Sequence, residues 1–389
     1  MKKVVIGLIV LLLLVGVIVY LSTKNQEPAT TASTNTTTTQ TTTDTSITTS
    51  DSGEQPSLVE QTLANMSLEE KVGQLFFARV PEINQLEDLQ TYHLGGYLLF
   101  GRDVENETRD SLKAKIASYQ EASTIPLLIG ADEEGGTVTR ISRNQQLVDT
   151  PFAAPQDIYA ASGLAGIVQD TKQKAQILTD YGISTGLFPV ADVATDPEAF
   201  IYDRTIGLDS DGTSDYIKKV VETLKAAHSG STLKHFPGYG NNRDSHVEIV
   251  TDDRPLAELQ ATALPSFQAG IDAGADSVLV SHNIVTSIDP EVPASISPAI
   301  HQLLRNQMHF DGVIMTDDMD MAGLADFISQ EEAGLAALKA GNDLVMSSSY
   351  SVQIPYVLQA IKEGAYTEAQ VDASVRRVLT WKMNLGLLN

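Results

Sequence analysis

The sequence predicts an α/β protein: a single (β/α)8 TIM-like barrel preceded by an N-terminal transmembrane helix and a disordered Thr/Ser-rich linker. Three observations predict this fold. The chain opens with an uncharged apolar run, a Thr/Ser-rich segment follows, and short apolar runs then alternate with amphipathic stretches. We therefore expect a membrane anchor or signal peptide at 1–22, a linker at 23–57 and a barrel domain at 58–389.

The first segment has the length and charge pattern of a membrane span. Lys2 and Lys3 precede residues 4–21, none of which is charged. A helix of this length reaches roughly 27 Å, close to the roughly 30 Å of the bilayer core. Because basic residues stay on the cytoplasmic side, we expect a single-pass membrane protein with its domain outside the cell. A cleaved leader, which would make the protein secreted, is the alternative, although Tyr20 and Leu21 are bulky for a cleavage site.

The second segment, 23–57, contains almost no large apolar side chain, and residues 30–50 are mostly Thr, Ser, Asn and Ala. Such a composition cannot bury enough surface to offset the entropy lost when a chain becomes ordered. The segment is therefore predicted to be a flexible spacer between the membrane and the domain.

The remaining chain is globular in composition, and a capping box at Ser67 and Glu70 predicts its first helix. Strands are expected at 74–78, 96–100, 126–130, 186–190, 232–235, 277–281, 313–316 and 343–346. Helices are expected at 109–118, 171–181, 214–227, 256–273 and 331–340, with a closing helix at 368–385. Continuous hydrophobicity fits strands covered on both faces, and strand–helix alternation fits a barrel. A doubly wound sheet is the alternative, but no Gly-rich dinucleotide or Walker loop is present.

Charge and cysteine content exclude several classes of function. The chain carries 26 Lys and Arg against 50 Asp and Glu, a net charge of −24, and no cysteine. An acidic surface repels nucleic acid, so we expect no nucleic-acid partner. The lack of cysteine excludes disulfides, thiolate metal sites and a cysteine nucleophile. Since no His and carboxylate cluster has metal-ligand spacing, we expect no metal and no cofactor. We also expect the protein to be a monomer.

Polar residues stand where the predicted strands end, which is where barrel enzymes place their chemistry. The longest such stretch runs from Lys234 to His246 through a Pro-Gly break and a Gly/Asn-rich loop, expected to be mobile. In an extended segment Asp244 and His246 point the same way and can meet. A carboxylate beside an imidazole fixes its tautomer and suits acid/base work near neutrality. The alternative is an Asx turn with an incidental surface histidine.

Three motifs together resemble glycoside hydrolase family 3, in its bacterial β-N-acetylglucosaminidase (β-hexosaminidase) branch. They are the stretch 234–246 (KHFPGYGNNRDSH), the stretch 132–136 (DEEGG) and the stretch 313–319 (VIMTDDM). The resemblance extends from about residue 58 to residue 388 and implies hydrolysis of β-glycosides with retention, through a covalent glycosyl-enzyme intermediate. It also implies that the barrel is the catalytic domain.

The resemblance assigns roles to individual residues. Asp317 matches the nucleophile, His246 the acid/base and Asp244 the carboxylate that orients this imidazole. The sugar-binding positions that it implies are Asp132, Arg204, Lys234 and His235. Structural alternatives are a helix cap for Asp132 and ion pairs for the cations, Arg204 above all, because its R-T-I-G context departs from the usual R-S-F-G. Tyr239 also departs from the pattern, since it replaces a customary histidine.

The resulting hypothesis is a membrane-tethered exo-β-N-acetylglucosaminidase that releases terminal non-reducing β-linked GlcNAc from peptidoglycan-derived saccharides. Its expected partners are a GlcNAc-containing glycan and, through the N-terminal helix, the membrane. A β-glucosidase or β-xylosidase of the same family is one alternative. A catalytically inactive, cell-wall-binding surface protein is another.

Overall fold

The computed structural model describes residues 57–388. The predicted anchor at 1–22 and all but the last residue of the predicted linker lie outside these residues. Within residues 57–388, no helix is both long and apolar enough to cross a bilayer.

Parallel strands form the centre of the fold, which confirms the predicted α/β class. One sheet has the order β11-β1-β2-β3 and the other the order β10-β8-β6. Their bounds are β1 Phe76–Arg79, β2 Gly96–Leu99, β3 Leu128–Ala131, β6 Thr232–Phe236, β8 Ser277–Val280, β10 Val313–Thr316 and β11 Val345–Ser347. Within residues 57–388, isolated parallel bridges add to these ladders and pair Gly130 with Thr185, Thr185 with Gly230, Val190 with Lys234, and Met315 with Leu344.

The expected strand at 186–190 makes only isolated bridges. Pro189 has no backbone N–H to donate to a neighbouring strand, and Leu187 has a φ of 47°, outside the β region. This segment therefore crosses between β3 and β6 without a regular ladder.

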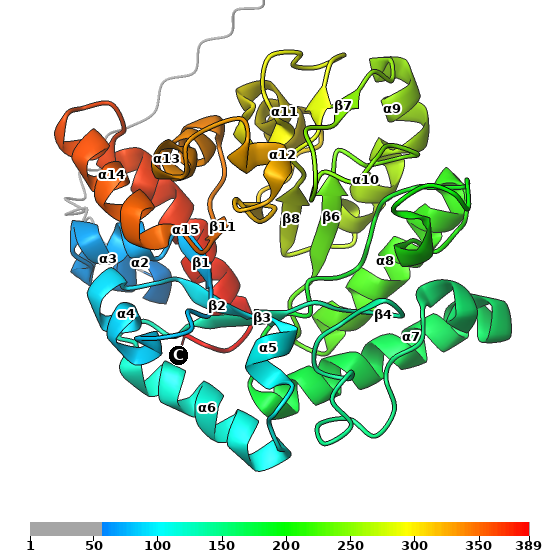
Figure 1. Ribbon diagram of the computed structural model, residues 1–389, viewed down its shortest axis with the longest axis horizontal. Coiled ribbons are helices and arrows are strands. Elements are labelled where there is room, and N and C mark those ends of the chain that lie inside the picture. Colours follow the sequence, from blue (N-terminus) through cyan, green and yellow to red (C-terminus); the bar gives the residue numbers. More distant parts are fainter. Residues whose placement is uncertain (1–56, 389) are drawn as a thin grey trace, which may run out of the picture. The chain divides into compact units, whose positions relative to one another are not determined.

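Helices surround the strands (Figure 1). Their bounds are α2 Leu58–Asn65, α3 Leu68–Gly73, α4 Gln85–Tyr92, α5 Gly101–Val104, α6 Arg109–Ala122, α7 Pro155–Tyr181, α8 Ser210–Ala226, α9 Leu256–Thr262, α10 Leu264–Asp272, α11 Pro298–Gln302, α12 Ala322–Ala325, α13 Gln330–Ala340, α14 Tyr350–Lys362 and α15 Glu368–Asn384. The capping box is present, with Glu70 N–H donating to Ser67 Oγ at 3.2 Å and Ser67 N–H to Glu70 Oε2 at 2.8 Å.

Two helices differ by more than a few residues from their predicted extents. The helix expected at 256–273 is broken into α9 and α10, because Pro265 has no N–H for the hydrogen bond that a continuous helix needs there. The helix α7 begins at Pro155, well before the expected residue 171, and changes direction at Gly163, whose φ is 59°. Glycine adopts this φ without steric cost.

Inward-facing side chains of the strands pack into a core with the closing helix. This cluster contains Leu98, Leu279, Met315 and Met346 of the strands and Trp381 of α15. Trp381 is buried, as expected for a core residue.

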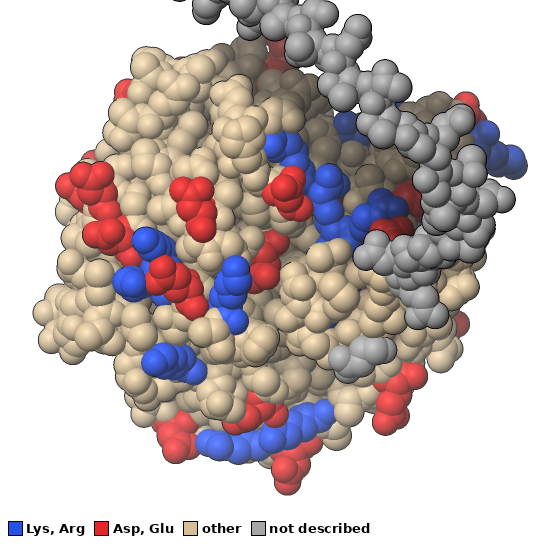
Figure 2. Space-filling view, turned by 180° about the vertical axis from the view of Figure 1, so that it is seen from behind, with Lys and Arg blue, Asp and Glu red and all other residues tan. Residues whose placement is uncertain are grey.

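Two short two-stranded sheets follow the carboxyl ends of the main strands. In the first, β4 (Glu133–Gly135) pairs antiparallel with β5 (Val138–Thr139), and Gly135 and Gly136 take positive φ at the turn. In the second, β7 (Thr251–Asp252) pairs with β9 (Ile284–Val285). The face opposite to that of Figure 1 carries Lys and Arg side chains among Asp and Glu side chains (Figure 2).

Candidate active site

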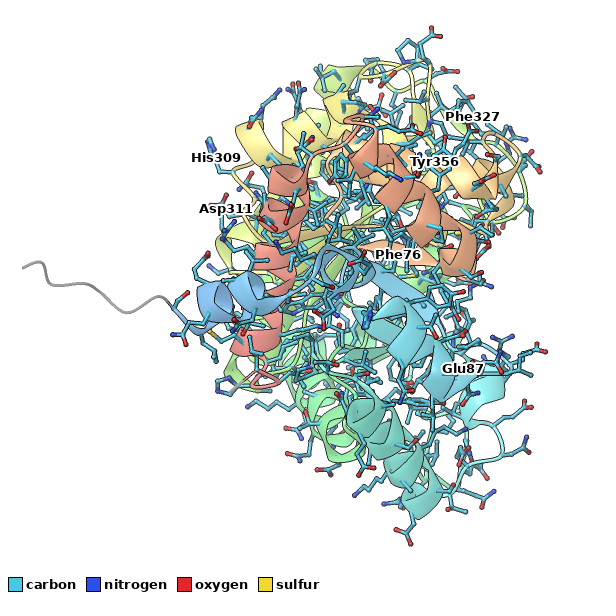
Figure 3. The ribbon with its side chains drawn as sticks, turned by 90° about the vertical axis from the view of Figure 1, so that its left-hand side faces the viewer. Phe76, Glu87, His309, Asp311, Phe327 and Tyr356 are labelled. Atoms are coloured by element: carbon cyan, nitrogen blue, oxygen red, sulfur yellow. The ribbon has the colours of Figure 1, made fainter. Side chains whose placement is uncertain are left out.

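A cavity of about 190 Å³ lies at the carboxyl ends of the strands. It brings together six of the seven predicted site residues: Asp132, Arg204, Lys234, His235, His246 and Asp317. The seventh, Asp244, does not line the cavity but contacts His246, which does. Leu98, Leu187, Leu279 and Met346 are among the apolar residues of the lining. Phe327, which follows α12, and Asp311, which precedes β10, lie on opposite sides of the molecule (Figure 3).

Asp317 follows β10 directly and is nearly buried. Its Oδ1 accepts the backbone N–H of Asp318 at 2.8 Å, whereas its Oδ2 has no hydrogen-bond partner among the described residues. Burial alone would raise the pKa of this carboxyl group, but the imidazoles of His235, His282 and His246 and the N–H of Asp318 hold it below its ordinary value. The group is therefore an ionised carboxylate with one oxygen free to react.

Asp318 has a different environment from Asp317. Its carboxylate accepts the Nε–H of Arg79 and, at 3.1 Å, the backbone N–H of Asp320. Burial raises the pKa of Asp318 to about 6, against the opposing effect of Arg79. His282 donates from Nε2 to the carbonyl oxygen of Asp318 at 2.9 Å. Asp318 is thus held from two sides, which favours Asp317 over it as a nucleophile.

Asp244 and His246 form the expected pair, but in a turn and not in an extended segment. Nδ1 of His246 lies 2.6 Å from Oδ1 of Asp244, and the backbone N–H of His246 donates to the same oxygen at 2.9 Å. The Asx-type turn that we set against pairing is therefore what brings the two side chains together. Because a carboxylate only accepts, Nδ1 carries the hydrogen and Nε2 remains available to a ligand.

The loop that carries this pair contacts the rest of the domain. Gly323 N–H donates to the carbonyl oxygen of Ser245 at 3.0 Å, and Ala322 N–H to that of His246 at 3.3 Å. The ring of Phe200 lies edge-on to the His246 imidazole, with 6.0 Å between centroids. His246 is held over the cavity by these contacts while its side chain stays partly exposed.

Four charged side chains form a network on one wall of the cavity. Lys234 Nζ lies 2.9 Å from Asp132 Oδ1 and also contacts Glu134, while Arg140 lies 3.0 Å from Asp132 Oδ2. Glu134 is buried and Asp132 is half-buried, which by itself raises the pKa of a carboxyl group, but the cations beside them hold both pKa values below the ordinary range. Asp132 is bonded to cations and is followed by β4, so it is not a helix cap.

Arg204 and His235 complete this wall. Arg204, at the end of the 3₁₀ turn Tyr202–Arg204, makes a two-pronged contact with Glu134 at 2.8 and 3.0 Å. Its Nη2 also lies 3.0 Å from Nε2 of His235, whose Nδ1 lies 2.7 Å from Asp192. The structural ion pair that we considered for Arg204 is therefore present, in a side chain that also lines the cavity.

Several lining residues were not predicted. Arg79 at the end of β1 and Arg140 after β5 lie on the ring of Phe100, with 4.8 and 5.6 Å to its centroid. Met321 also lines the cavity. The position of Arg79 at a strand end is the one sequence signal that could have indicated it. No cluster of His, Asp and Glu able to hold a metal ion occurs in residues 57–388.

Comparison with known proteins relates the whole domain to one family. The profile of the glycosyl hydrolase family 3 N-terminal domain matches residues 67–381. A beta-hexosaminidase of Xanthomonas campestris pv. campestris (strain B100) is 35% identical over 265 residues, 66% of this chain and 78% of that protein. Beta-hexosaminidase LpqI of Mycobacterium tuberculosis (strain ATCC 25618 / H37Rv) is 30% identical over 332 residues, 82% of this chain and 84% of that protein.

Solved structures agree with these sequence relatives. A glycoside hydrolase family 3 β-N-acetylglucosaminidase from Paenibacillus sp. str. FPU-7 superposes with a TM-score of 0.78 at 26% identity, covering 83% of this chain. The chain spans only 63% of the length of that enzyme. M. tuberculosis LpqI superposes with a TM-score of 0.76 at 28% identity, covering 83% of this chain and 96% of the other.

Proposed function

Because the chain belongs to glycosyl hydrolase family 3, we propose that it is a retaining exo-β-N-acetylglucosaminidase that releases terminal non-reducing β-linked GlcNAc. One observation carries the proposal: the Asp317 carboxylate and the His246 imidazole line the same cavity. Retention requires a nucleophile below the anomeric carbon and an acid/base group at the departing oxygen. The names of the relatives support the sugar.

In the first step, Asp317 is the nucleophile. Its carboxylate oxygen bonds to C1 of the sugar as the bond from C1 to the leaving oxygen breaks. His246, protonated at Nε2, gives that proton to the leaving oxygen, and Asp244 stabilises the imidazolium before the transfer. The products are a glycosyl ester of Asp317 and the shortened glycan.

In the second step, neutral His246 takes a proton from a water molecule whose oxygen bonds to C1. The bond from C1 to Asp317 breaks, so the carboxylate is regenerated and GlcNAc leaves with its original anomeric configuration. Two inversions at C1 account for the retention.

The charged wall is proposed to bind the sugar hydroxyl groups. Asp132 can accept hydrogen bonds from them, Lys234 and Arg204 can donate to them, and His235 can donate or accept. Because these groups already neutralise one another, the wall is organised before a ligand binds, which lowers the cost of ordering it.

We also propose that the eight parallel segments close into a (β/α)8 barrel spanning 58–389. The bridges at Thr185 and Val190 support closure between β3 and β6, and the bridge from Met315 to Leu344 supports closure between β10 and β11. In such a barrel the cavity would lie at the catalytic mouth.

The natural substrate is proposed to be a peptidoglycan-derived saccharide, cleaved by a monomer outside the cell. The support is the sequence of residues 1–22, which has the pattern of an anchor with an outward-facing chain. Membrane fractionation of cells expressing the full chain, followed by protease treatment of intact cells, tests this placement.

The decisive experiment is product analysis on GlcNAc-MurNAc fragments, with Asp317→Asn as the control. We expect free GlcNAc from the wild type and none from the variant. Comparing aryl-GlcNAc with aryl-glucoside and aryl-xyloside tests the alternative specificities within the family. Binding of the glycan without turnover would instead support an inactive wall-binding protein.

A further inference from the structure

We propose that the hydroxyl group of Tyr239 positions the general acid by fastening the loop that carries Asp244 and His246. This inference rests on the proposed function and adds to it a residue that touches neither the sugar nor the reacting atoms. Tyr239 is therefore a positioning residue.

Tyr239 is buried at the start of this loop, three residues after the end of β6. Its hydroxyl group is hydrogen-bonded to Oγ of Ser245, which is also buried and lies directly between Asp244 and His246. The bond closes residues 239–245 into a ring. Ser245 then has its side chain fixed by Tyr239 and its carbonyl oxygen fixed by Gly323 N–H at 3.0 Å.

The other end of Tyr239 is fixed to the sugar-binding wall. Its backbone N–H donates to Asp192 Oδ1 at 2.7 Å, and the other oxygen of Asp192 holds Nδ1 of His235. The Tyr239 ring lies edge-on to that of His235, with 5.2 Å between centroids. Thus the same residue contacts the wall on one side and the loop on the other.

A small apolar cluster supports this arrangement. Tyr239 packs with Ala194 and Ile201, and the partly buried Phe200 packs against them. Phe200 lies edge-on to Tyr239 at 5.6 Å and to the His246 imidazole at 6.0 Å. His246 is therefore positioned along two routes from Tyr239: through Ser245 in the backbone and through Phe200 at the ring.

A positioning role makes a specific kinetic prediction. Substrates with poor leaving groups need the proton from His246, whereas activated aryl glycosides do not. Tyr239→Phe removes the hydroxyl group and keeps the ring, so it should lower kcat/KM about tenfold for a disaccharide or phenyl GlcNAc. For dinitrophenyl GlcNAc we expect the change to be less than about twofold.

Ser245→Ala should reproduce this pattern, and the double variant should be no worse than either single one, because both remove the same hydrogen bond. Tyr181→Phe is the matched control. Tyr181 is also buried and donates its hydroxyl to a backbone carbonyl, that of Leu147, at 2.6 Å, outside the cavity. It should carry a similar stability cost without changing the preference between leaving groups.

A second measurement does not depend on turnover. In the full chain labelled at histidine, the NMR signal of His246, assigned with His246→Gln, should shift or broaden in Tyr239→Phe and stay unchanged in Tyr181→Phe. Equal kinetic losses on both classes of substrate, or an unchanged His246 signal, would overturn the positioning role. A wild type that cleaves no glycoside would refute the proposed function, and the NMR comparison would still decide the role of Tyr239.

Discussion

Lys382 of α15 is fully buried, and the cost of burying its charge should make the free energy of unfolding depend on pH. Its Nζ donates to Gln74 Oε1 at 2.6 Å, and no carboxylate within residues 57–388 forms an ion pair with it. Burial lowers the pKa of Lys382 from 10.5 to about 7. The perturbation is Lys382→Met, which keeps most of the side-chain volume and removes the charge.

The sign follows from proton linkage. Between pH 7 and 10.5 the unfolded chain holds a proton on Lys382 that the folded chain lacks, so the free energy of unfolding rises with pH by about 1.4 kcal/mol per unit. From pH 7 to pH 9 the wild type should gain about 2 to 3 kcal/mol relative to Lys382→Met. Below pH 7 both states are protonated and the difference between the two proteins should be constant.

Equilibrium urea denaturation of the two proteins at several pH values from 6 to 9 measures this difference. Lys219→Met, which removes a surface lysine in a short-range pair with Glu222, is the control and should leave the pH dependence unchanged. If wild type and Lys382→Met show parallel stability curves over this range, Lys382 titrates normally and the reasoning from burial is refuted.

Three further predictions concern the cavity. His246→Gln should slow poor leaving groups by at least about a hundredfold and activated aryl glycosides far less; an equal loss, measured as kcat/KM, would remove His246 from the acid role. Arg79→Met leaves buried Asp318 without its cation, so the pKa of Asp318 should rise above about 6; a carboxyl NMR titration in which the pKa of Asp318 does not rise would contradict this. Lys234→Met leaves Asp132 and Glu134 short of a buried partner and should lower the free energy of unfolding by about 3–5 kcal/mol in urea denaturation, whereas exposed Lys219→Met should lower it by less than about 1 kcal/mol.

The strands show which parts of the fold can be predicted from the local sequence. The apolar run 313–316 lies between a glycine and two aspartates, and β10 has the same bounds. The run 186–190 is equally apolar, yet Leu187 and Pro189 leave it without a ladder. Hydrophobicity thus located this segment, but whether a run forms hydrogen bonds to its neighbours depends on its backbone geometry.

In the candidate site, too, some contacts could be predicted from the sequence and others could not. Asp244 and His246 are two residues apart, so their pairing could be anticipated, although it occurs in an Asx turn and not in an extended segment. The docking of this loop on α12 could not be anticipated, because Ser245 and Gly323 are distant in sequence.

By itself the sequence determined the chemistry that is available: an acidic chain without cysteine, strand ends that carry carboxylates and imidazoles, and motifs specific to one family. Only the tertiary structure decided which groups meet. Arg79 reaches Asp318 across 239 positions of the chain, and Lys234 reaches Asp132 across 102. Such contacts follow from the order and register of the strands. Because strand order and register depend on the packing of the whole domain, no local propensity encodes them.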